Sequence, residues 1–391
     1  MSSRVERCDV AVAGAGTAGI VAALAAARGG ARVALIESSN RVGGIAIYGL
    51  HRFVCGLFRN GGTRAGEPLH GSATMEFCRR LAGGDPKHFA VRRGRVWLLP
   101  FAGGEALAAC AEAEIAGGKN IQLIKGDPIV RAECAGGRMA AIELASGLVV
   151  HSTTAIDCSG SATLCRLAGA QVDWPSQPAL AGYGFEVTAA DESKAGPLGL
   201  SLAVPYLLRQ AVDVGRLPAH LAYATWEPAE ISGQGWIKLA LPAQAIAHAR
   251  EQAYAAWSIL KNAPPFAQAR ILRHVPAPVV RETGHLRGEY VLTENDVLSA
   301  RDFPDAVVYN AWPIERWEEG RGVSYRYLPD GQAHGIPLRC LRPQGGPANL
   351  LCAGAAISAD AAAAASLRVM GVCMALGEAA AVHCLARISR L

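Results

Sequence analysis

The sequence of 391 residues has little charge: 18% of its residues are charged, and the formal net charge is only +5. No block of lysine and arginine dominates any segment, which argues against nucleic acid as a partner. The 51% of hydrophobic residues exclude a disordered chain and supply a large buried core. A chain of this length is expected to form two domains.

The cysteines lack the patterns typical of disulfide frameworks or metal sites. There are 11 of them, an odd number, without one C-x-x-C pair, and most lie in apolar segments where a thiol acts as a small hydrophobic group. H-E-x-x-H, H-x-E and clustered Cys/His sets are also missing, so we expect no metal. These absences predict a reduced, cytoplasmic protein, and they leave open whether it is a homo-oligomer.

The first long apolar run, DVAVAGAGTAGIVAALAAAR at residues 9–28, has two interpretations. Its eighteen uncharged residues could span a membrane or form a signal-peptide core. Its glycines, Gly14, Gly16 and Gly19, fit instead the order strand, G-x-G-x-x-G, helix, which places phosphates at the N-terminus of the helix. A second apolar strand at 32–36 completes a β-α-β unit. We therefore predict a nucleotide cradle, and no membrane span here or elsewhere, because charges interrupt the alanine-rich C-terminal stretch.

Glu37 ends this second strand, where a carboxylate accepts hydrogen bonds from a ribose diol and repels a 2′-phosphate. The sequence SSNRVGG follows, with Arg41, Gly43 and Gly44. An acid followed by R-x-G-G resembles the FAD-dependent oxidoreductases of the glutathione reductase/succinate dehydrogenase type. In that family the two glycines let the chain pass close to the flavin.

Two distant segments extend the resemblance. AIDCSGSATLCRLAGA at 155–170 is similar to the family's second motif, a strand ending in D-A-T-G, with Asp157, Ser159 and Gly160 at the matching positions. The tail from residue 349 resembles the family pattern G-R-x-I-S…R-V-M…G-x-A-A-G, although Ala355 stands where many relatives have arginine. In the family the helix that starts near Arg368 points its N-terminus at the flavin pyrimidine, where it would stabilise negative charge.

The resemblance implies FAD as the cofactor and an α/β fold. A discontinuous Rossmann-like FAD-binding domain would comprise residues 1–75, 100–170 and 345–391. An inserted α+β substrate domain with a mixed or antiparallel sheet would comprise 76–99 and 171–344. The cofactor residues it implies, with Val130 on a β-meander near the adenine, are Gly14, Ala15, Gly16, Thr17, Ala18, Gly19, Glu37, Ser38, Arg41, Gly43, Gly44, Ile45, Val130, Ser159, Gly160, Gly354, Arg368 and Val369.

The middle of the chain shows strands at 182–188 and 235–243 and an amphipathic helix at 243–262, which two prolines end. No second G-x-G-x-x-G follows a strand here, so we expect no separate NAD(P)H domain. The segment 280–315 and GIPLRCLRP at 335–343 resemble a subgroup known only as FAD-dependent oxidoreductases. Leu338 replaces the tyrosine of that subgroup.

Four side chains are candidates for chemistry. His51 and Cys55 follow the diglycine, where His51 could act as a base and either could tether or adjoin the flavin. The alternative is that Cys55 packs in a loop and His51 bonds a backbone carbonyl. Arg281 and Arg339 could clamp a substrate carboxylate, or Arg281 could instead pair with Glu282 or Asp296 and join the domains.

Other polar and aromatic residues have a second, purely structural interpretation. The lone histidines His285 and His334 are expected to face solvent. Four aromatic residues could wall a substrate pocket or pack in the core, namely Trp312, Trp317, Tyr325 and Tyr327.

The function expected from the resemblance is that of an FAD-dependent oxidoreductase, which transfers a hydride between flavin N5 and a small organic substrate. A flavin-dependent monooxygenase is the alternative within enzymes. A third hypothesis, from another class, is an FAD-binding maturation or assembly partner that acts on another protein.

Overall fold

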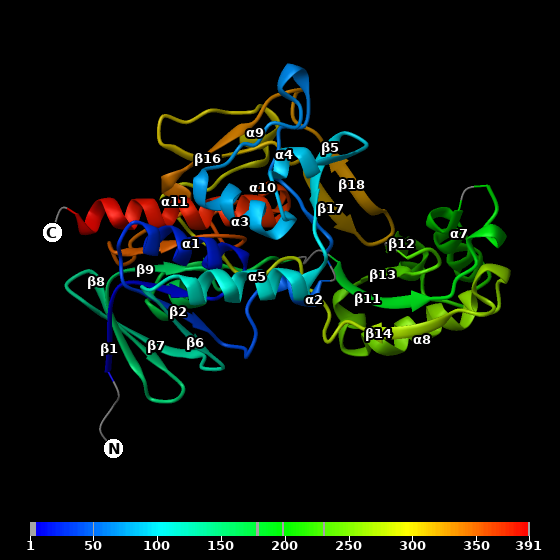
Figure 1. Cartoon of the computed structure of the whole chain (residues 1–391), viewed down its shortest axis with the longest axis horizontal. Coiled ribbons are helices and arrows are strands. Elements are labelled where there is room, and N and C mark those ends of the chain that lie inside the picture. The colour runs from blue at the N-terminus through cyan, green and yellow to red at the C-terminus, as the bar shows by residue number, and fades with distance from the viewer. Residues whose placement is uncertain (1–4, 50, 177–179, 198, 230, 390–391) are drawn as a thin grey trace.

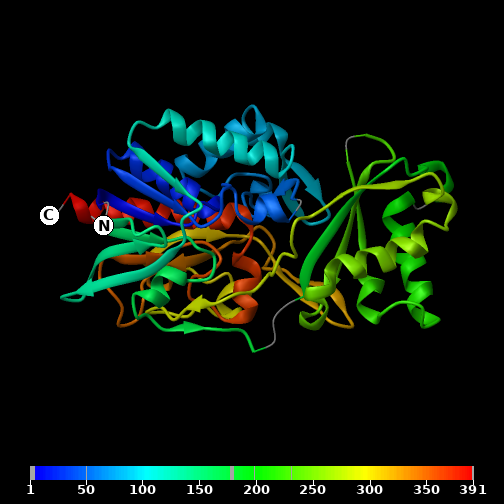
Figure 2. The same cartoon turned by 90° about the horizontal axis from the view of Figure 1, so that it is seen from below.

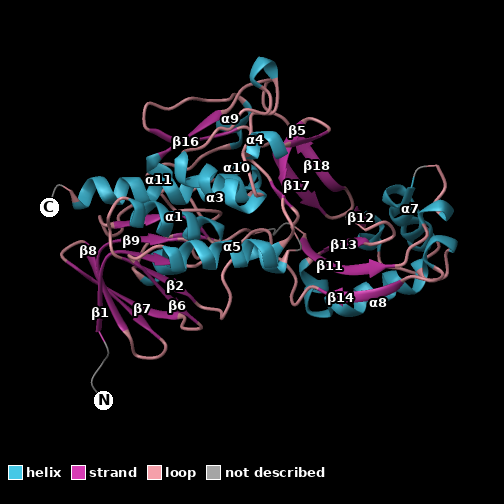
Figure 3. Cartoon of the chain, in the orientation of Figure 1, coloured by secondary structure: helices cyan, strands magenta, loops and turns pink. Residues whose placement is uncertain are grey.

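The computed structural model describes residues 5–49, 51–176, 180–197, 199–229 and 231–389. The chain forms two lobes side by side, and the first and last described residues lie at the far end of the larger lobe (Figure 1). Each lobe combines helices with strands (Figure 3).

The larger lobe is built, within the described residues, on a seven-stranded sheet in the order β6-β2-β1-β9-β8-β7, with β20 also paired to β9. β1 is parallel to both β2 and β9, with Val12 opposite Leu35 and Ile156. The predicted α/β fold with a Rossmann-like sheet is therefore confirmed. The strands are β1 (Val5–Ala13), β2 (Val33–Glu37), β6 (Ile121–Lys125), β7 (Ile129–Ala135), β8 (Arg138–Leu144), β9 (Val149–Asp157) and β20 (Leu350–Cys352).

Two helices that lie far apart in the sequence pack along each other on this sheet. They are α1 (Thr17–Arg28) and α11 (Met370–Ile388). Small residues allow the close approach, because a Cβ at Gly377 would overlap the carbonyl of Ala18. The C-terminal segment thus closes the domain that the N-terminus begins.

By length and composition, α11 is the one helix among the described residues that could cross a bilayer, although no such segment was expected outside the first apolar run. Two of the charges thought to interrupt the C-terminal stretch, Asp360 and Arg368, precede the helix, which leaves Glu378 and Arg387 within it. More than half of α11 is buried inside the protein. A core helix of a globular domain has the same features.

The segment after the glycine loop covers α1. The helices α3 (Ser72–Ala82) and α5 (Gly104–Gly117) both contact α1, and α3 also contacts α11. The short helix α2 (Ile45–Tyr48) follows the diglycine, and a small antiparallel sheet in the order β3-β5-β4 follows it. Its strands are β3 (Phe53–Val54), β4 (Val91–Arg93) and β5 (Val96–Pro100), and the short helix α4 (Pro86–Phe89) precedes β4.

The smaller lobe consists of a four-stranded antiparallel sheet in the order β12-β13-β11-β14 and two helices. The helices and the sheet enclose a separate core around Phe185, Ile237 and Leu260. The predicted helix at 243–262 is shorter in the structure, because residues 243–248 form a 3-10 turn after Pro242. The elements are β11 (Ala181–Thr188), β12 (Thr225–Pro228), β13 (Gly235–Leu241), β14 (Arg270–His274), α7 (Gly199–Asp213) and α8 (Ala249–Leu260).

The chain then returns to the larger lobe, as Figure 2 shows for the yellow and orange segments. Leu292, Val308 and Ile336 are buried in the same core as α1 and α11. The separate core therefore spans only about residues 183–275, which is narrower than the predicted 171–344. The returning elements are β15 (His285–Leu286), paired with β10 (Val172–Asp173), α9 (Glu294–Leu298), β16 (Ala306–Asn310), β17 (Ile314–Glu318), β18 (Gly322–Arg326), β19 (His334–Pro337) and α10 (Ala361–Leu367).

Candidate active site

A cavity of about 450 Å³ lies between the two lobes, next to the N-terminal ends of α1 and α11. The diglycine segment, β11, β13 and β17 supply the other walls. Of the predicted cofactor residues, ten line it: Gly16, Thr17, Ala18, Gly44, Ile45, Ser159, Gly160, Gly354, Arg368 and Val369.

The glycine loop leaves room for a ligand at the first turn of α1. A Cβ at Gly16 would contact no atom within 4 Å, whereas a Cβ at Gly19 would overlap the carbonyl oxygen of Gly14. No side chain caps α1, and its first turn carries no acidic residue. The helix therefore presents unpaired amides and positive potential to the cavity, which suits a pyrophosphate.

Glu37 ends β2, and backbone amides hold its carboxylate. Its carboxylate is 9% exposed and accepts hydrogen bonds from the backbone amides of Ala15 and Ser39, each at 2.8 Å. Ser38 donates a further bond from its hydroxyl at 3.3 Å. A carboxylate has about four acceptor sites, so it retains the capacity to bind a ribose hydroxyl.

The diglycine packs directly on the glycine loop. The amide of Gly43 donates to the carbonyl of Ala15 at 2.8 Å. Gly44 has φ +52°, and a Cβ there would lie 3.0 Å from the Cα of Gly16. The positive φ of Gly44 and its close approach to Gly16 both favour glycine. They bring the two predicted cofactor motifs together.

The second motif ends β9 at the same edge. The buried carboxylate of Asp157 accepts bonds from the amides of Ser159 and Cys165, at 2.9 and 2.8 Å. This fixes the turn at Gly160, whose carbonyl accepts the hydroxyl of Thr283 at 2.6 Å. Asp157 acts by shaping the loop.

The other eight predicted cofactor residues do not line the cavity: Gly14, Ala15, Gly19, Glu37, Ser38, Arg41, Gly43 and Val130. Arg41 and Val130 are exposed. Arg41 pairs with Glu105. The side chain of Val130 is 50% exposed on β7. The amide of Gly126, just before β7, donates to the carbonyl of Ser39, just after β2, at 2.9 Å. The role of Val130 at the adenine stays a prediction.

His51 and Cys55 both line the cavity. Burial and the nearby cations Lys238, Arg281 and Arg368 lower the pKa of His51 to about 3, so its imidazole is neutral at pH 7. Burial and the charge of Glu315 raise the pKa of the Cys55 thiol well above its usual range. Cys55 is therefore a protonated thiol, a poor nucleophile for tethering a flavin.

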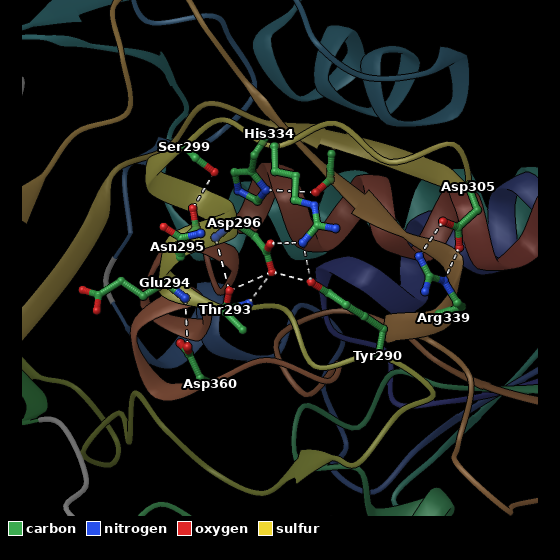
Figure 4. A network of polar contacts seen from close by, with 12 residues as sticks. Tyr290, Thr293, Glu294, Asn295, Asp296, Ser299, Asp305, His334, Arg339 and Asp360 are labelled. Carbon is green, nitrogen blue, oxygen red and sulfur yellow. Dashed lines mark hydrogen bonds and ion pairs between the residues drawn. The ribbon is translucent and has the colours of Figure 1, made fainter.

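The structure does not bring Arg281 and Arg339 together. Arg281 lines the cavity, with its guanidinium carbon 4.2 Å from the ring centre of Trp317. Arg339 lies outside the cavity and forms a bidentate ion pair with Asp305, at 2.9 and 3.0 Å (Figure 4). The clamp predicted from these two arginines does not form, because a surface carboxylate occupies Arg339.

The alternative role of Arg281 as a partner of Asp296 is also wrong. Asp296 caps α9 through Thr293 and accepts bonds from Tyr290 at 2.8 Å and Arg301 at 2.9 Å (Figure 4). These donors satisfy its carboxylate. Arg281 instead donates to the carbonyl of Leu180.

Arg368 contributes a second guanidinium to the cavity. Its Nη2 donates to the backbone carbonyl of Glu315 at 2.9 Å, and its Nε is buried without a partner. Burial lowers the pKa of Arg368, and burial together with Arg368 lowers the pKa of Arg281 to about 9. Both side chains are thus poised to gain from a negatively charged ligand.

His285 and His334 are predicted to face solvent, but neither is exposed in the structure. His334 is 0% exposed; its Nε2 bonds to the side-chain Nδ2 of Asn310 at 3.1 Å and its Nδ1 to the carbonyl of Gly335 at 3.0 Å. His285 is half-buried, with a buried Nδ1 that has no partner. Each lies on a short strand that is paired within the larger lobe, so packing covers its ring.

Of the four candidate aromatic residues, only Trp317 lines the cavity. Trp312 is 5% exposed in the core, and Tyr325 stacks on Tyr327 with ring centres 6.1 Å apart. The core interpretation holds for Trp312.

Several lining residues escaped the sequence analysis, among them Tyr48, Tyr183, Lys238 and Glu315. Lys238 carried a usable signal, because it is the one charge in the apolar strand GWIKLAL and pairs with Glu227. Glu315 carried none, since it sits in a mixed polar hairpin. Among the described residues, no group of three or more potential ligands could hold a metal ion.

Comparisons with known proteins agree on the type of fold and on the cofactor. A family model described as FAD dependent oxidoreductase matches residues 9–183 and 185–390. No curated protein matches the chain.

Many solved structures are similar at low sequence identity. Aquifex aeolicus GidA gives a TM-score of 0.53 at 12% identity, over 98% of this chain and 64% of its own length. A geranylgeranyl bacteriochlorophyll reductase-like protein from Thermoplasma acidophilum gives 0.50 at 13% identity, over 99% and 80%. The p-nitrophenol 4-monooxygenase PnpA from Pseudomonas putida gives 0.50 at 13% identity, over 99% and 81%. Identities this low show a shared fold alone.

Proposed function

The chain belongs to the FAD-dependent oxidoreductase family, and from this premise we propose that it transfers a hydride between flavin N5 and a small organic substrate. The observation that carries the proposal is the continuity of the cavity. Its walls include the glycine cradle on one side and Tyr183, Lys238, Arg281 and Trp317 on the other. A bound flavin and a substrate would therefore share one cavity.

The residues present fit FAD. The open space at Gly16, the uncapped N-terminus of α1 and the held carboxylate of Glu37 suit a pyrophosphate and a ribose. When bound, the flavin supplies the hydride chemistry. The protein must bind the substrate, orient it and exclude water.

The N-terminus of α11 would sit at the pyrimidine edge of the flavin, as the family pattern implies. It has no side-chain cap, and Arg368 precedes it with a buried, unpartnered Nε. A positive helix end and a guanidinium both stabilise negative charge. They would favour the reduced state of the cofactor.

Neutral His51 would orient the substrate. An imidazole with a pKa of about 3 is a weak base, but it can donate one hydrogen bond and accept another. Its ring packs on Gly49, where a Cβ would overlap Nε2, so the ring position is fixed by the backbone. We propose that His51 positions a substrate hydroxyl or amine.

The second candidate function is a monooxygenase, because p-nitrophenol 4-monooxygenase and a reductase-like protein share this fold equally and the fold does not separate the two reactions. Anaerobic addition of substrate separates the two. A dehydrogenase loses its yellow colour without NAD(P)H, whereas a monooxygenase consumes NAD(P)H and couples oxygen uptake to a hydroxylated product. If neither reaction occurs with any small molecule and a stable protein complex is recovered instead, a maturation partner is favoured.

We also propose that the protein works in a reducing compartment such as the cytoplasm, with small molecules as its partners. The 11 cysteines, all within the described residues, are free. A cavity of about 450 Å³ between the lobes suits a small ligand better than a protein surface.

A further inference from the structure

Two arginines of the cavity lack a carboxylate partner. Within the described part of the chain, neither Arg281 nor Arg368 forms an ion pair; Arg281 donates to the carbonyl of Leu180 and Arg368 to that of Glu315. We propose that the substrate is an organic carboxylate and that Arg281 binds its carboxylate group. The inference rests on the proposed function, because it assigns the ligand on the substrate side of the same cavity.

Arg281 is held in place with one edge free. Its guanidinium stacks on the indole of Trp317, and Nη1 donates to the carbonyl of Leu180. A Cβ at Gly182 would lie 3.2 Å from Nη2, so the missing side chain leaves space for the guanidinium beside β11. Nη2 has no acceptor among the described residues and faces the cavity that Gly182 also lines. A stacked arginine with a free edge is preorganised to bind a carboxylate.

The charges around the cavity favour an anion. Lys238 is neutralised by Glu227. The carboxylate of Glu315 accepts the indole N–H of Trp317 at 2.6 Å, and its charge partly counteracts the lowering of the pKa of both Arg281 and Arg368. One carboxylate offsets only part of the charge of two guanidiniums. Arg281 and Arg368 also repel each other, which contributes to the lowered pKa of Arg281. A bound carboxylate would relieve this repulsion and compensate the desolvated charge.

The two arginines have different roles in this scheme. Arg368 lies at the N-terminus of α11, on the cofactor side, whereas Arg281 lies on the segment that leaves the smaller lobe. The walls near Arg281 are apolar, with Leu239, Val279 and Val280. The predicted ligand is a carboxylate attached to a small apolar body.

The test compares matched charged and neutral probes on the flavin-loaded protein. Benzoate and acetate are titrated against benzamide and acetamide, and the visible spectrum of the flavin and the Tm of the protein report binding. We expect both carboxylates to bind at least about tenfold more tightly than their amides. Arg281→Met should remove this preference and leave amide binding unchanged, and Arg281→Lys should keep part of it.

Arg316→Met is the matched control. Arg316 lies on the same hairpin as Trp317, pairs with Glu318 at 3.8 Å and does not line the cavity. If Arg281→Met fails to fold, Gly182→Ala, which crowds Nη2, should weaken carboxylate binding in its place.

The proposal is overturned if the amides bind as tightly as the carboxylates, if no carboxylate binds, or if Arg281→Met keeps the preference. These failures differ from failure of the proposed function. If the proposed function is wrong, the wild-type protein would contain no flavin. The Tm shift of that flavin-free protein would still report whether carboxylates bind.

Discussion

The substitution Gly16→Val tests FAD binding independently of the stability of the fold. Gly16 has φ −72° and ψ −177°, an extended conformation that valine adopts readily, and a Cβ there meets no atom within 4 Å. We therefore expect the stability of the FAD-free protein to change by no more than about 0.5 kcal/mol. The added methyl groups would occupy the space of the pyrophosphate at the N-terminus of α1.

The expected loss of affinity follows from the amides of that helix. Displacing a pyrophosphate from two charge-assisted hydrogen bonds costs about 3 kcal/mol, which corresponds to a Kd for FAD raised more than about 100-fold. Titration of FAD-free protein with FAD, followed by fluorescence quenching of the flavin, measures the Kd. The Tm of the same preparation measures stability.

Gly19→Val is the contrasting variant. Its Cβ would overlap the carbonyl oxygen of Gly14, so both the Tm of the FAD-free protein and the affinity for FAD should fall. If Gly16→Val binds FAD as tightly as wild type, or loses it only with a drop in Tm equal to that of Gly19→Val, the cradle is wrongly assigned.

Further changes probe other parts of the molecule. Glu37→Gln should weaken FAD binding about tenfold by fluorescence titration, because the ribose loses a charged acceptor. Arg368→Met should lower the two-electron potential of the flavin by about 30 mV, the equivalent of about 1.4 kcal/mol, in a redox titration. Buried His334 has its pKa lowered to about 4, so only the unfolded state takes up its proton between about pH 6.5 and 4. The contribution of His334 to the unfolding free energy should therefore fall by about 1 kcal/mol per pH unit across that window in urea titrations. His334→Gln should make the measured fall shallower by that amount, while buried His51 keeps its own contribution. Phe185→Ala should cost about 3 kcal/mol or more in the smaller lobe's core while the larger lobe keeps its flavin, as near-UV circular dichroism and absorbance would show.

The cofactor half of the molecule was predictable because its signals are local. Spacing alone placed the glycines of the loop before α1 and Glu37 at the end of β2, and the structure puts both motifs at one edge of the sheet. The distant tail was predictable through its resemblance to the family pattern, and in the structure Gly377 packs against Ala18.

The substrate half was less predictable because its side chains depend on tertiary partners. Arg281 and Arg339 look alike in sequence, but Asp305 occupies only Arg339. The sequence predicts that His334 lies in a solvent-facing loop. In the structure, pairing of β19 with β16 buries it beside Asn310. No pattern along the chain encodes such pairings.

The visible absorption spectrum of the purified protein, recorded before and after acid precipitation, tests the central claim most directly. The account predicts a flavin spectrum with about one FAD per chain, and release of that FAD into the supernatant because Cys55 is a protonated thiol. A well-folded protein that is colourless and takes up no flavin from excess FAD would contradict it.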